Sequence, residues 1–286
     1  MNMGGTWKYW GMGLTLGVAS CAFGQTGLTV QDLDIQRQYW FKKAAAGDVD
    51  AQFVMGDGYL SGRMNLPRDG QRAAEWFLKA AQHGHADSQF ELGKLYYFGT
   101  LCVTPNGPEA VHWLRSAEAQ PGLKSKQRSF AQMLLATCFT TGLGIGKDDV
   151  EAARWFRKAA QGGDHLAEYR LGLCFLNGSG VPQDDREASF WLLKAANAGE
   201  TEAQVKLAGI YTNGRGLPQD YVEAYKWFNL AAAKGDNQAE KSRELLRSIM
   251  TPRQVAEAQR LSSDYYNRVS ASADATDRIA PPMRLQ

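Results

Sequence analysis

The sequence has no strong excess of charge of either sign and no long apolar run after residue 24. Its 32 Lys and Arg residues nearly balance 30 Asp and Glu residues, for a formal net charge of +2. No basic stripe with interleaved aromatic residues occurs, so we expect no nucleic-acid partner. A membrane-spanning helix needs about 20 predominantly apolar residues, so none is expected beyond residue 24.

Metal-binding and catalytic motifs are also missing. The four His and four Cys residues follow no known metal-ligand spacing. Ser-x-x-Lys, Ser-Asp-Asn and Lys-Thr-Gly, the motif set of serine β-lactamases, do not occur. Residues 142–149, "GLGIGKDD", resemble a phosphate loop, but Thr141 and Asp148 stand where the motif needs Gly and Ser or Thr. We therefore expect no catalytic residue, no metal and no cofactor.

What the sequence does contain is a repeat of about 36 residues. Six of its eight tryptophans recur in one register, each followed directly by Phe or Leu and four residues later by Ala. Apolar residues with such spacing form one face of an α-helix. Each of these tryptophans therefore marks one helix of the repeat. They are Trp40, Trp76, Trp113, Trp155, Trp191 and Trp227, with steps of 36, 37, 42, 36 and 36.

Asp or Asn precedes five of these helices, and Glu follows it three residues later in four copies. The cap oxygen can accept from a first-turn N–H, and the Glu can reach back to the cap's own N–H, as in a capping box. Capping explains these recurring acids without catalysis. The caps are Asp69, Asn106, Asp148, Asp184 and Asp220, and the Glu residues are Glu109, Glu151, Glu187 and Glu223.

The other half of each repeat is a second helix. One side of it carries, in order, a small residue, then Leu, then Gly or Ala, and then an aromatic residue. The clearest copy is Ala167-Leu171-Gly172-Phe175, followed by a loop with Gly178 and Gly180. Neither helix of such a pair can bury its apolar face alone, so neighbouring pairs must stack. The sequence predicts an all-α solenoid of helix-loop-helix units.

The combination of Ala-x-x-x-Leu-Gly-x-x-Tyr, a Gly-x-Gly-Val loop, an Asp cap and Ala-x-x-Trp-Phe-x-x-Ala-Ala resembles the Sel-one-like repeat (SLR), a relative of the tetratricopeptide repeat. The resemblance extends from Tyr39 to Asp236. It implies a right-handed α-solenoid that serves as a protein-binding scaffold. We assign residues 32–236 to this solenoid, with a lone first helix followed by five helix pairs.

Two cysteines, Cys138 and Cys174, occupy equivalent positions 36 residues apart. Stacked helices keep their axes about 8–10 Å apart, whereas a disulfide needs Cα atoms within about 7 Å. We expect core thiols and no bridge, with Cys102 in an irregular loop. A cysteine-rich branch of the resembled family carries paired cysteines within each repeat and is linked to β-lactam hydrolysis, but this chain lacks that pairing.

The first 24 residues have the features of a secretory signal peptide. Lys8 precedes a short apolar run, and Ala22-Phe23-Gly24 forms a cleavage site. The alternative is that "VASC" is a lipobox, which would make Cys21 a lipidated N-terminus. Either route predicts export, with a periplasmic or secreted protein in the first case and a lipid-anchored one in the second.

After the repeats, residues 237–268 read as two capping helices. The first should turn Ala239, Leu245, Leu246 and Ile249 inward, and the second begins after Thr251 with Pro at its first position. A solenoid needs such a terminal cap with a polar outer side. Residues 269–286 are poor in apolar residues, so we expect a disordered tail.

Two candidate surfaces for a protein or peptide partner stand out. One is a polar row that follows the small residue of each second helix and could bind an extended backbone. The other is the basic stretch "AQPGLKSKQRSF" between Trp113 and Trp155, where the chain carries six residues beyond one 36-residue period. Each could instead be merely solvated. The row is Gln52, Gln89, Gln132, Glu168 and Gln204, and the basic residues are Lys124, Lys126 and Arg128.

These features together predict an exported, non-catalytic scaffold or adaptor that binds protein through its solenoid surface. The alternative is an envelope enzyme that acts on β-lactams or binds cell-wall peptides, a function of the resembled family's cysteine-rich branch.

Overall fold

The computed structural model describes residues 29–278, and its thirteen helices account for all regular structure within that range. The helices are α1 (Val30–Ala45), α2 (Val49–Ser61), α3 (Gly70–Gln82), α4 (Ala86–Phe98), α5 (Gly107–Ala119), α6 (Ser125–Thr141), α7 (Asp149–Gln161), α8 (His165–Asn177), α9 (Asp185–Asn197), α10 (Thr201–Asn213), α11 (Tyr221–Ala233), α12 (Asn237–Ile249) and α13 (Pro252–Arg278).

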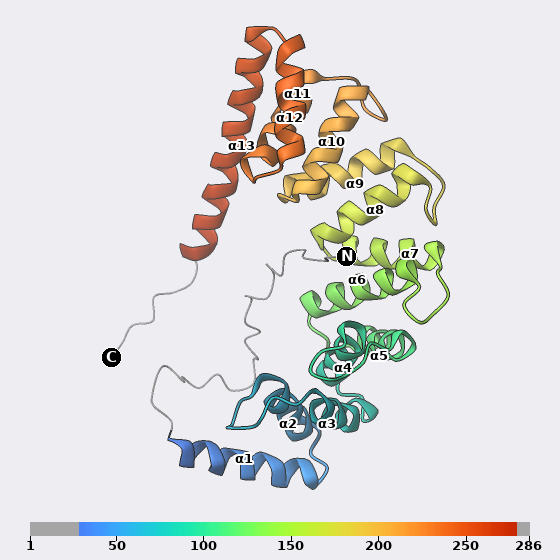
Figure 1. Ribbon diagram of the computed structural model, residues 1–286, viewed down its shortest axis with the longest axis vertical. Helices are drawn as coiled ribbons and strands as arrows, with labels where there is room; N and C mark the ends of the chain where they lie inside the picture. Colours follow the sequence, from blue (N-terminus) through green and yellow to red (C-terminus); the bar gives the residue numbers. More distant parts are fainter. Residues whose placement is uncertain (1–28, 279–286) are drawn as a thin grey trace.

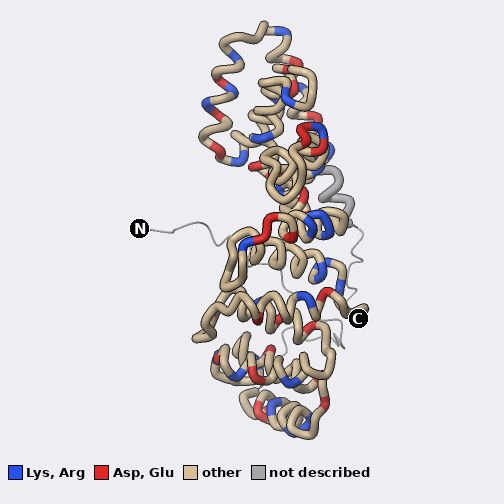
Figure 2. The backbone as a smooth tube through the Cα atoms, turned by 90° about the vertical axis from the view of Figure 1, so that its right-hand side faces the viewer, with Lys and Arg blue, Asp and Glu red and all other residues tan. Residues whose placement is uncertain are grey.

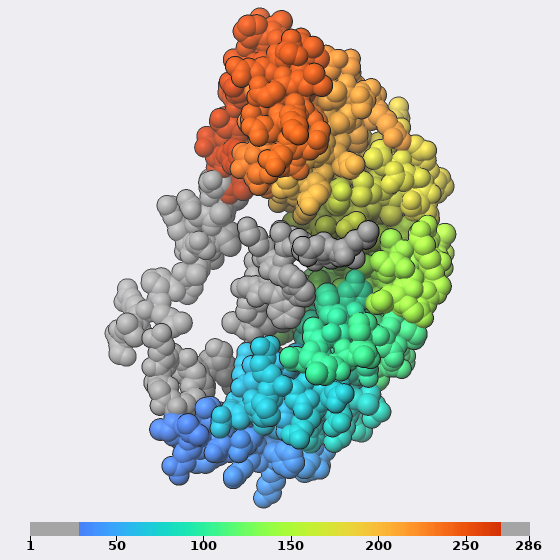
Figure 3. All heavy atoms as spheres, in the orientation of Figure 1, coloured from blue at the N-terminus to red at the C-terminus, as the bar shows by residue number. Residues whose placement is uncertain are grey.

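The helices pack in sequential pairs that follow an arc (Figure 1). α1 precedes five pairs, from α2 and α3 to α10 and α11, and α12 and α13 follow the last pair. In Figure 1, α2, α4 and α6 lie on the inner side of the arc, whereas α3, α5 and α7 lie on the outer side. In the space-filling view the coloured atoms follow the same arc (Figure 3). The expected all-α fold of stacked helix pairs is confirmed.

Glycine in the inner helices allows the paired helices to approach closely. A Cβ atom on Gly172 of α8 would lie only 2.8 Å from Cγ of Leu192 on α9, and one on Gly93 of α4 would lie 2.7 Å from Cγ of Leu114 on α5. These distances are too short for a carbon–carbon contact, so a side chain at either position would force the facing leucine to move. Leu114 and Leu192, which directly follow Trp113 and Trp191, therefore pack on the backbone of the paired inner helix.

The later tryptophans form the buried row that their spacing predicts. Trp113, Trp155, Trp191 and Trp227 are buried, and Trp76 is half-buried. Trp227 is the largest fully buried side chain, with 1% of its surface exposed. Burial of such large aromatic side chains supplies much of the apolar area that holds neighbouring pairs together.

Trp40, the first of the six recurring tryptophans, lies one position out of this register. The carbonyls of Ala44 and Ala81 accept the same kind of hydrogen bond from the following inner helix, so these two alanines are structurally equivalent. Trp40 lies four residues before Ala44, and Phe77 lies four residues before Ala81. Trp40 therefore takes the place of Phe77, and the exposed Tyr39 takes the tryptophan position.

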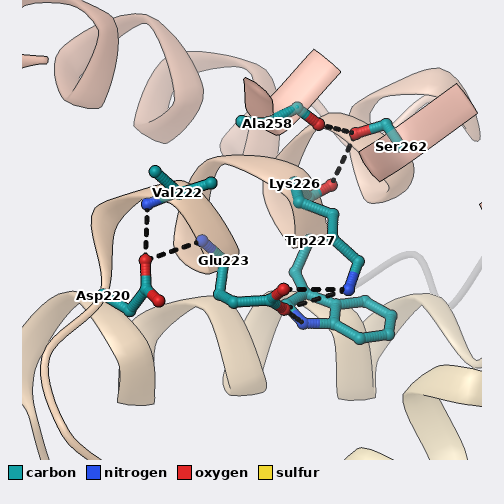
Figure 4. Close-up of polar contacts among 7 residues, drawn as sticks. All are labelled: Asp220, Val222, Glu223, Lys226, Trp227, Ala258 and Ser262. Carbon is teal, nitrogen blue, oxygen red and sulfur yellow. Dashed lines mark hydrogen bonds and ion pairs between the residues drawn. The ribbon is translucent and has the colours of Figure 1, made fainter. Parts of the chain in front are cut away.

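All five predicted caps accept a hydrogen bond from a first-turn N–H, but the predicted capping boxes are wrong. The cap's own N–H already donates to a carbonyl near the end of the preceding helix, as Asp148 does to Phe139 at 3.0 Å. In the last repeat the Glu side chain instead binds the tryptophan: Glu223 Oε2 accepts from Nε1 of Trp227 at 3.1 Å (Figure 4). The caps are Asp69, Asn106, Asp148, Asp184 and Asp220.

Gly180 holds the loop of one repeat against the outer helix of the repeat before it. Its φ angle is +72°, in the left-handed region, and an added Cβ would lie 1.8 Å from the carbonyl oxygen of Asp149. Both conditions exclude any larger residue without movement of the backbone. The Gly-bearing loops are thus contacts between repeats as well as helix ends.

The C-terminal cap is formed mainly by α13, which covers the last tryptophan. The Tyr265 ring meets Trp227 edge-on at 5.8 Å, and Ser262 Oγ donates to carbonyls of Ala258 and Lys226 (Figure 4). α13 continues to Arg278, so the expected disordered tail is wrong for residues 269–278. Residues 279–286 lie outside the described part of the chain.

α12 differs from its predicted orientation. Ala239 and Leu246 are buried as expected, but Leu245 is 70% exposed and Ile249 is 60% exposed. Met250 is the residue that turns into the core at the end of this helix. The interpretation of Leu245 and Ile249 as core residues is therefore wrong.

Cys138 and Cys174 are buried free thiols, as the sequence predicts, and Cys102 is free and exposed. Burial raises the pKa of both buried thiols to about 11. The predicted signal peptide 1–24, including the alternative lipidation site Cys21, lies outside the described residues.

Candidate functional site

The predicted polar row is buried, so the expectation of an exposed binding surface on these residues is wrong. Three of its glutamines donate from Nε2 to a backbone carbonyl eight residues earlier, at the end of the preceding outer helix. The pairs are Gln52 with Ala44 (3.3 Å), Gln89 with Ala81 (3.0 Å) and Gln204 with Ala196 (3.2 Å). Each of these helix-end carbonyls also accepts a backbone N–H from the following turn, from Gly47 (3.1 Å), Gly84 (3.0 Å) and Gly199 (3.0 Å) respectively, so the glutamine adds a second donor.

The two remaining members of the row form other contacts, and only Gln132 reaches the preceding outer helix. Gln132 donates to the Glu118 carboxylate at 3.0 Å, at the end of α5. Glu168 cannot donate, and its buried carboxylate instead contacts His165 Nδ1 at 3.1 Å and Lys194 Nζ at 3.5 Å. Four members of the row therefore join successive repeats, Glu168 binds within its own helix pair, and all five are buried and closed to a partner.

Replacing Gln89 with alanine should destabilise the fold. The change removes the hydrogen bond from Gln89 Nε2, while the Ala81 carbonyl keeps the one from the Gly84 N–H at 3.0 Å, so we expect a loss of about 1 kcal/mol. Urea unfolding followed by circular dichroism measures the loss. Gln82→Ala, an exposed glutamine at the end of α3, is the matched control and should change the midpoint little. Equal midpoints for the two variants would contradict the junction role.

The basic stretch before α6 divides into two parts. Arg128 is half-buried, and its guanidinium donates to the carbonyls of Glu118, Gln120 and Leu123. It fixes the inserted turn, so its interpretation as a free partner contact is wrong. Lys124 and Lys126 are exposed, and a role for them in binding stays a prediction.

The turn before α10 contains a carboxyl in an unusual setting. Glu200 occupies the N-cap, where Asp stands in three other inner helices, but its longer side chain makes no cap hydrogen bond. Burial, and next the side-chain hydrogen bond and the charge of Glu202, raise the pKa of Glu200 to about 7. Lys234 and His165 act in the opposite direction.

This setting predicts that Glu200 destabilises the protein once it ionises. A carboxyl whose pKa is raised by folding contributes stability below its unfolded pKa, and that contribution is lost as the pH rises through about 7. Glu200→Gln should therefore raise the melting temperature relative to the parent at about pH 8 and not at about pH 5. Thermal unfolding across this range measures the difference. The exposed control Glu187→Gln should follow the parent, and a Glu200→Gln profile parallel to the parent's would contradict the prediction.

The surface that the inner helices leave open lies on the side opposite their packed face. In an α-helix, positions three, six and ten after the small reference residue point away from positions four, five and eight, which pack on the outer helix. The reference residues are Ala51, Ser88, Ala131, Ala167, Ala203 and Ala239. We call the three resulting sets the inner rows.

All members of the inner rows except the buried Leu134 are exposed or half-buried. Sequence reasoning missed them, although the repeat spacing could have located them. The first row is Val54, Glu91, Leu134, Arg170, Lys206 and Ser242; the second is Asp57, Lys94, Thr137, Leu173, Gly209 and Leu245; the third is Ser61, Phe98, Thr141, Asn177, Asn213 and Ile249.

In the N-terminal half, the charges of the inner rows neutralise one another. Lys94 lies 2.8 Å from both carboxylate oxygens of Glu91, and Asp57 lies 2.9 Å from Arg63. Burial raises the pKa of Asp57, while Arg63 and Lys94 oppose that shift. This half therefore offers little free charge to a partner.

The C-terminal half, on α8, α10 and α12, differs in chemistry. Its inner rows contain two exposed cations, Arg170 and Lys206, and no carboxylate. Among the described residues neither cation forms an ion pair, and Arg170 lies over the Tyr169 ring at 5.8 Å. Seen from the right-hand side of Figure 1, where the outer helices lie, charges of both signs are distributed along the chain (Figure 2). The exposed Glu202 lies four residues before Lys206 and therefore on the same side of α10, so this half also carries charges of both signs.

Within residues 29–278, no group of three or more His, Cys, Asp or Glu residues is positioned to hold a metal ion. No helix in the same range is both long and apolar enough to cross a membrane.

Comparison with protein families identifies the repeats. The Sel1 repeat profile matches residues 38–49, 49–85, 86–121, 129–164, 165–200 and 201–236. The chain belongs to the Sel1 repeat family. The matched segments follow the helix pairs described above, and the Sel1 repeat, which is the SLR motif, confirms the resemblance found in the sequence.

Solved structures of Sel1 repeat proteins share the fold. A protective antigen present in uropathogenic Escherichia coli strains is 27% identical with a TM-score of 0.62, over 88% of this chain and 60% of its own. This chain thus spans less than two thirds of that antigen. A Sel1 repeat protein from Oxalobacter formigenes is 30% identical with a TM-score of 0.59, over 74% of this chain and 82% of its own. A search of curated proteins found no significant match.

Proposed function

We propose that this Sel1 repeat protein is an exported, non-catalytic scaffold that binds a protein partner along its inner rows. The observation that carries the proposal is that several side chains of those rows are exposed and form no contact that the fold needs. Arg170, Lys206, Leu245 and Ile249 are exposed on the inner helices and take no part in the core or in ion pairs among the described residues. Side chains of this kind, repeated along a curved surface, suit an extended partner.

The repeated polar residues support a scaffold over an enzyme. The recurring Asp and Asn residues cap helices, and the buried Gln residues bind helix-end carbonyls. Burial raises the pKa of both buried thiols to about 11, which disfavours the nucleophilic thiolate. Each repeated group thus has a structural role that accounts for its recurrence.

Export is the second part of the proposal and rests on residues 1–24, with their basic start, apolar run and small-x-small site. N-terminal sequencing of protein from the native host should give Gln25 as the first residue. A lipid-modified Cys21 would instead show that the protein is anchored.

Site-specific photo-crosslinking tests the binding surface. A photoreactive residue is placed at Asn177 or Asn213, both exposed in the third inner row, or at Glu187 on the outer helix α9 as the control. In envelope extract, the inner positions should give the same saturable adduct, identified by mass spectrometry, and the outer position should not. Adducts only from the outer position would move the binding surface. Nitrocefin hydrolysis by the purified protein would favour the enzyme alternative.

A further inference from the structure

A pocket of about 390 Å³ lies at the N-terminal end of the solenoid, between α1, α2, the loop after α2 and the start of α3 (Figure 1). Pockets that bind small ligands begin at about 300 Å³ and combine an apolar lining with a few polar groups. None of the residues that line this pocket belongs to the inner rows. The pocket is therefore distinct from the proposed inner binding surface.

The apolar part of the lining is partly open to solvent. Met55 and Tyr59 of α2 and Leu66 of the following loop line the pocket and belong to the buried N-terminal core. Phe41 of α1 lines it too, but this side chain is 50% exposed, with its ring edge-on to Trp76 at 5.9 Å. A ligand with an apolar group would remove this exposed ring from water, which is favourable.

Two arginines, Arg37 and Arg72, line the same pocket, and the second departs from the pattern of the repeat. Arg72 stands where the later outer helices have glutamate, and it lies over the Tyr59 ring at 5.6 Å. In two of those helices the glutamate accepts the indole N–H of a tryptophan, which an arginine cannot do. A guanidinium at the pocket thus replaces a structural carboxylate. The glutamates are Glu109, Glu151, Glu187 and Glu223.

Both arginines keep hydrogen-bond donors for a ligand. Asp34 Oδ1 lies 3.0 Å from Arg37 Nη2 but has no hydrogen-bond partner among the described residues, so this ion pair is misaligned. Asp69 lies 3.5 Å from Arg72 Nε, and its Oδ1 accepts the Arg72 backbone N–H as the cap of α3. Each guanidinium has five N–H donors in a planar fork.

The two aspartates balance the charge of the arginines, although neither of them lines the pocket. Long-range attraction of an anion is therefore not expected. Exposed ion pairs of this kind are weak, whereas a carboxylate that accepts two N–H groups from one guanidinium forms strong, directed bonds. Selection at this pocket thus depends on contact between a carboxylate and the guanidinium groups.

We infer that this pocket binds a carboxylate carried on an apolar group, with the apolar group against Phe41 and Tyr59 and the carboxylate hydrogen-bonded to Arg37 and Arg72. Small apolar acids have this chemistry, and so does the C-terminus of a peptide that ends in an apolar residue. The inference is independent of the proposed inner-surface function, because none of these residues belongs to the inner rows.

Ligand-observed NMR titration of the purified protein with 4-phenylbutyrate tests the inference. The first control, 4-phenylbutanamide, keeps the apolar group and has no charge. The second, butyrate, keeps the carboxylate and lacks the ring. The protein should bind 4-phenylbutyrate about tenfold more tightly than either control, because only this ligand satisfies both parts of the pocket. Equal affinities for the acid and its amide, or no saturable binding of the acid, would overturn the inference.

Arginine variants locate the site. Arg37→Gln combined with Arg72→Gln should abolish the tenfold preference for the acid while binding of the amide stays the same. Arg68→Gln is the charge-matched control, because this exposed arginine lies in the loop between α2 and α3 but does not line the pocket. Phe41→Ala should weaken acid and amide alike. Thermal unfolding confirms that each variant is folded.

An unchanged preference for the acid in the folded double variant would overturn the inference. If the double variant fails to fold, the single variant Arg72→Gln must still reduce the preference, since this side chain is exposed and its replacement disturbs no core contact. A preference equal to that of the Arg68→Gln control would then count against the site.

Two peptides distinguish the sources of the carboxylate. The N-acetylated tetrapeptide Ala-Ala-Ala-Phe is compared with the same peptide as its C-terminal amide. Tighter binding of the peptide acid than of 4-phenylbutyrate, lost in the peptide amide, supports the inference and assigns the pocket to a protein C-terminus. Weaker binding of the peptide acid than of 4-phenylbutyrate supports the inference and assigns the pocket to a small apolar acid.

Discussion

Trp227→Ala should lower the free energy of unfolding by about 3–5 kcal/mol. The side chain is 1% exposed and is enclosed by α11 and α13, where the Tyr265 ring meets it at 5.8 Å. Its removal creates a cavity and deprives Glu223 of the indole N–H that donates at 3.1 Å. Urea unfolding followed by far-ultraviolet circular dichroism measures the loss.

Phe190→Ala provides the control for this prediction. Phe190 is also a large aromatic residue on an outer helix, but it is 52% exposed. Exposed substitutions usually change stability by no more than about 0.5 kcal/mol, so this variant should unfold close to the parent. A Trp227→Ala midpoint as high as that of Phe190→Ala would contradict the assignment of Trp227 to the core.

Gly180→Ala should also be strongly destabilising, for a reason that involves the backbone. A left-handed conformation costs a residue with a Cβ about 1–2 kcal/mol, and Gly180 has a φ of +72°. The added Cβ would further lie 1.8 Å from the Asp149 carbonyl, so the loop must move away from the preceding repeat. We expect a total loss of about 3 kcal/mol or more in the same unfolding experiment.

Gly146→Ala is the matched control in the loop of the preceding repeat. Its φ is not positive, and an added Cβ would meet nothing within 4 Å. Replacing such a glycine restricts the unfolded chain and leaves the native contacts in place, so stability should stay the same or rise slightly. A Gly180→Ala variant as stable as Gly146→Ala would show that this loop adjusts without loss.

The fold was predictable because its periodicity comes directly from the core. Large apolar residues must recur wherever one pair packs on the next, and Trp155, Trp191 and Trp227 record that spacing. The register failed at Trp40 through coincidence: its distance from Trp76 equals one common repeat step, although the structural equivalent of Trp76 is Tyr39.

The candidate site was harder to predict, because a recurring polar residue has two physical explanations. Gln89 could have been exposed to a partner or buried against a backbone group, and its sequence pattern is the same in both cases. The acceptor is a carbonyl, which every residue has, so no side chain marks its position. Glu223 shows the same limit. Its carboxylate accepts the indole N–H of Trp227, because the N–H of the cap residue Asp220 already donates to the carbonyl of Tyr211.

The bond from Gln52, Gln89 and Gln204 to a carbonyl eight residues earlier has a consequence for how this chain can evolve. Loss of the segment 165–200 would place Gln204 eight residues after Ala160, the counterpart of its present acceptor Ala196. The same hydrogen bond from Gln204 Nε2 to a helix-end carbonyl would form, and Asp164 would cap the helix in place of Glu200. Gene duplication or deletion of such a unit can therefore lengthen or shorten the inner surface while the hydrogen bond at the new junction is kept.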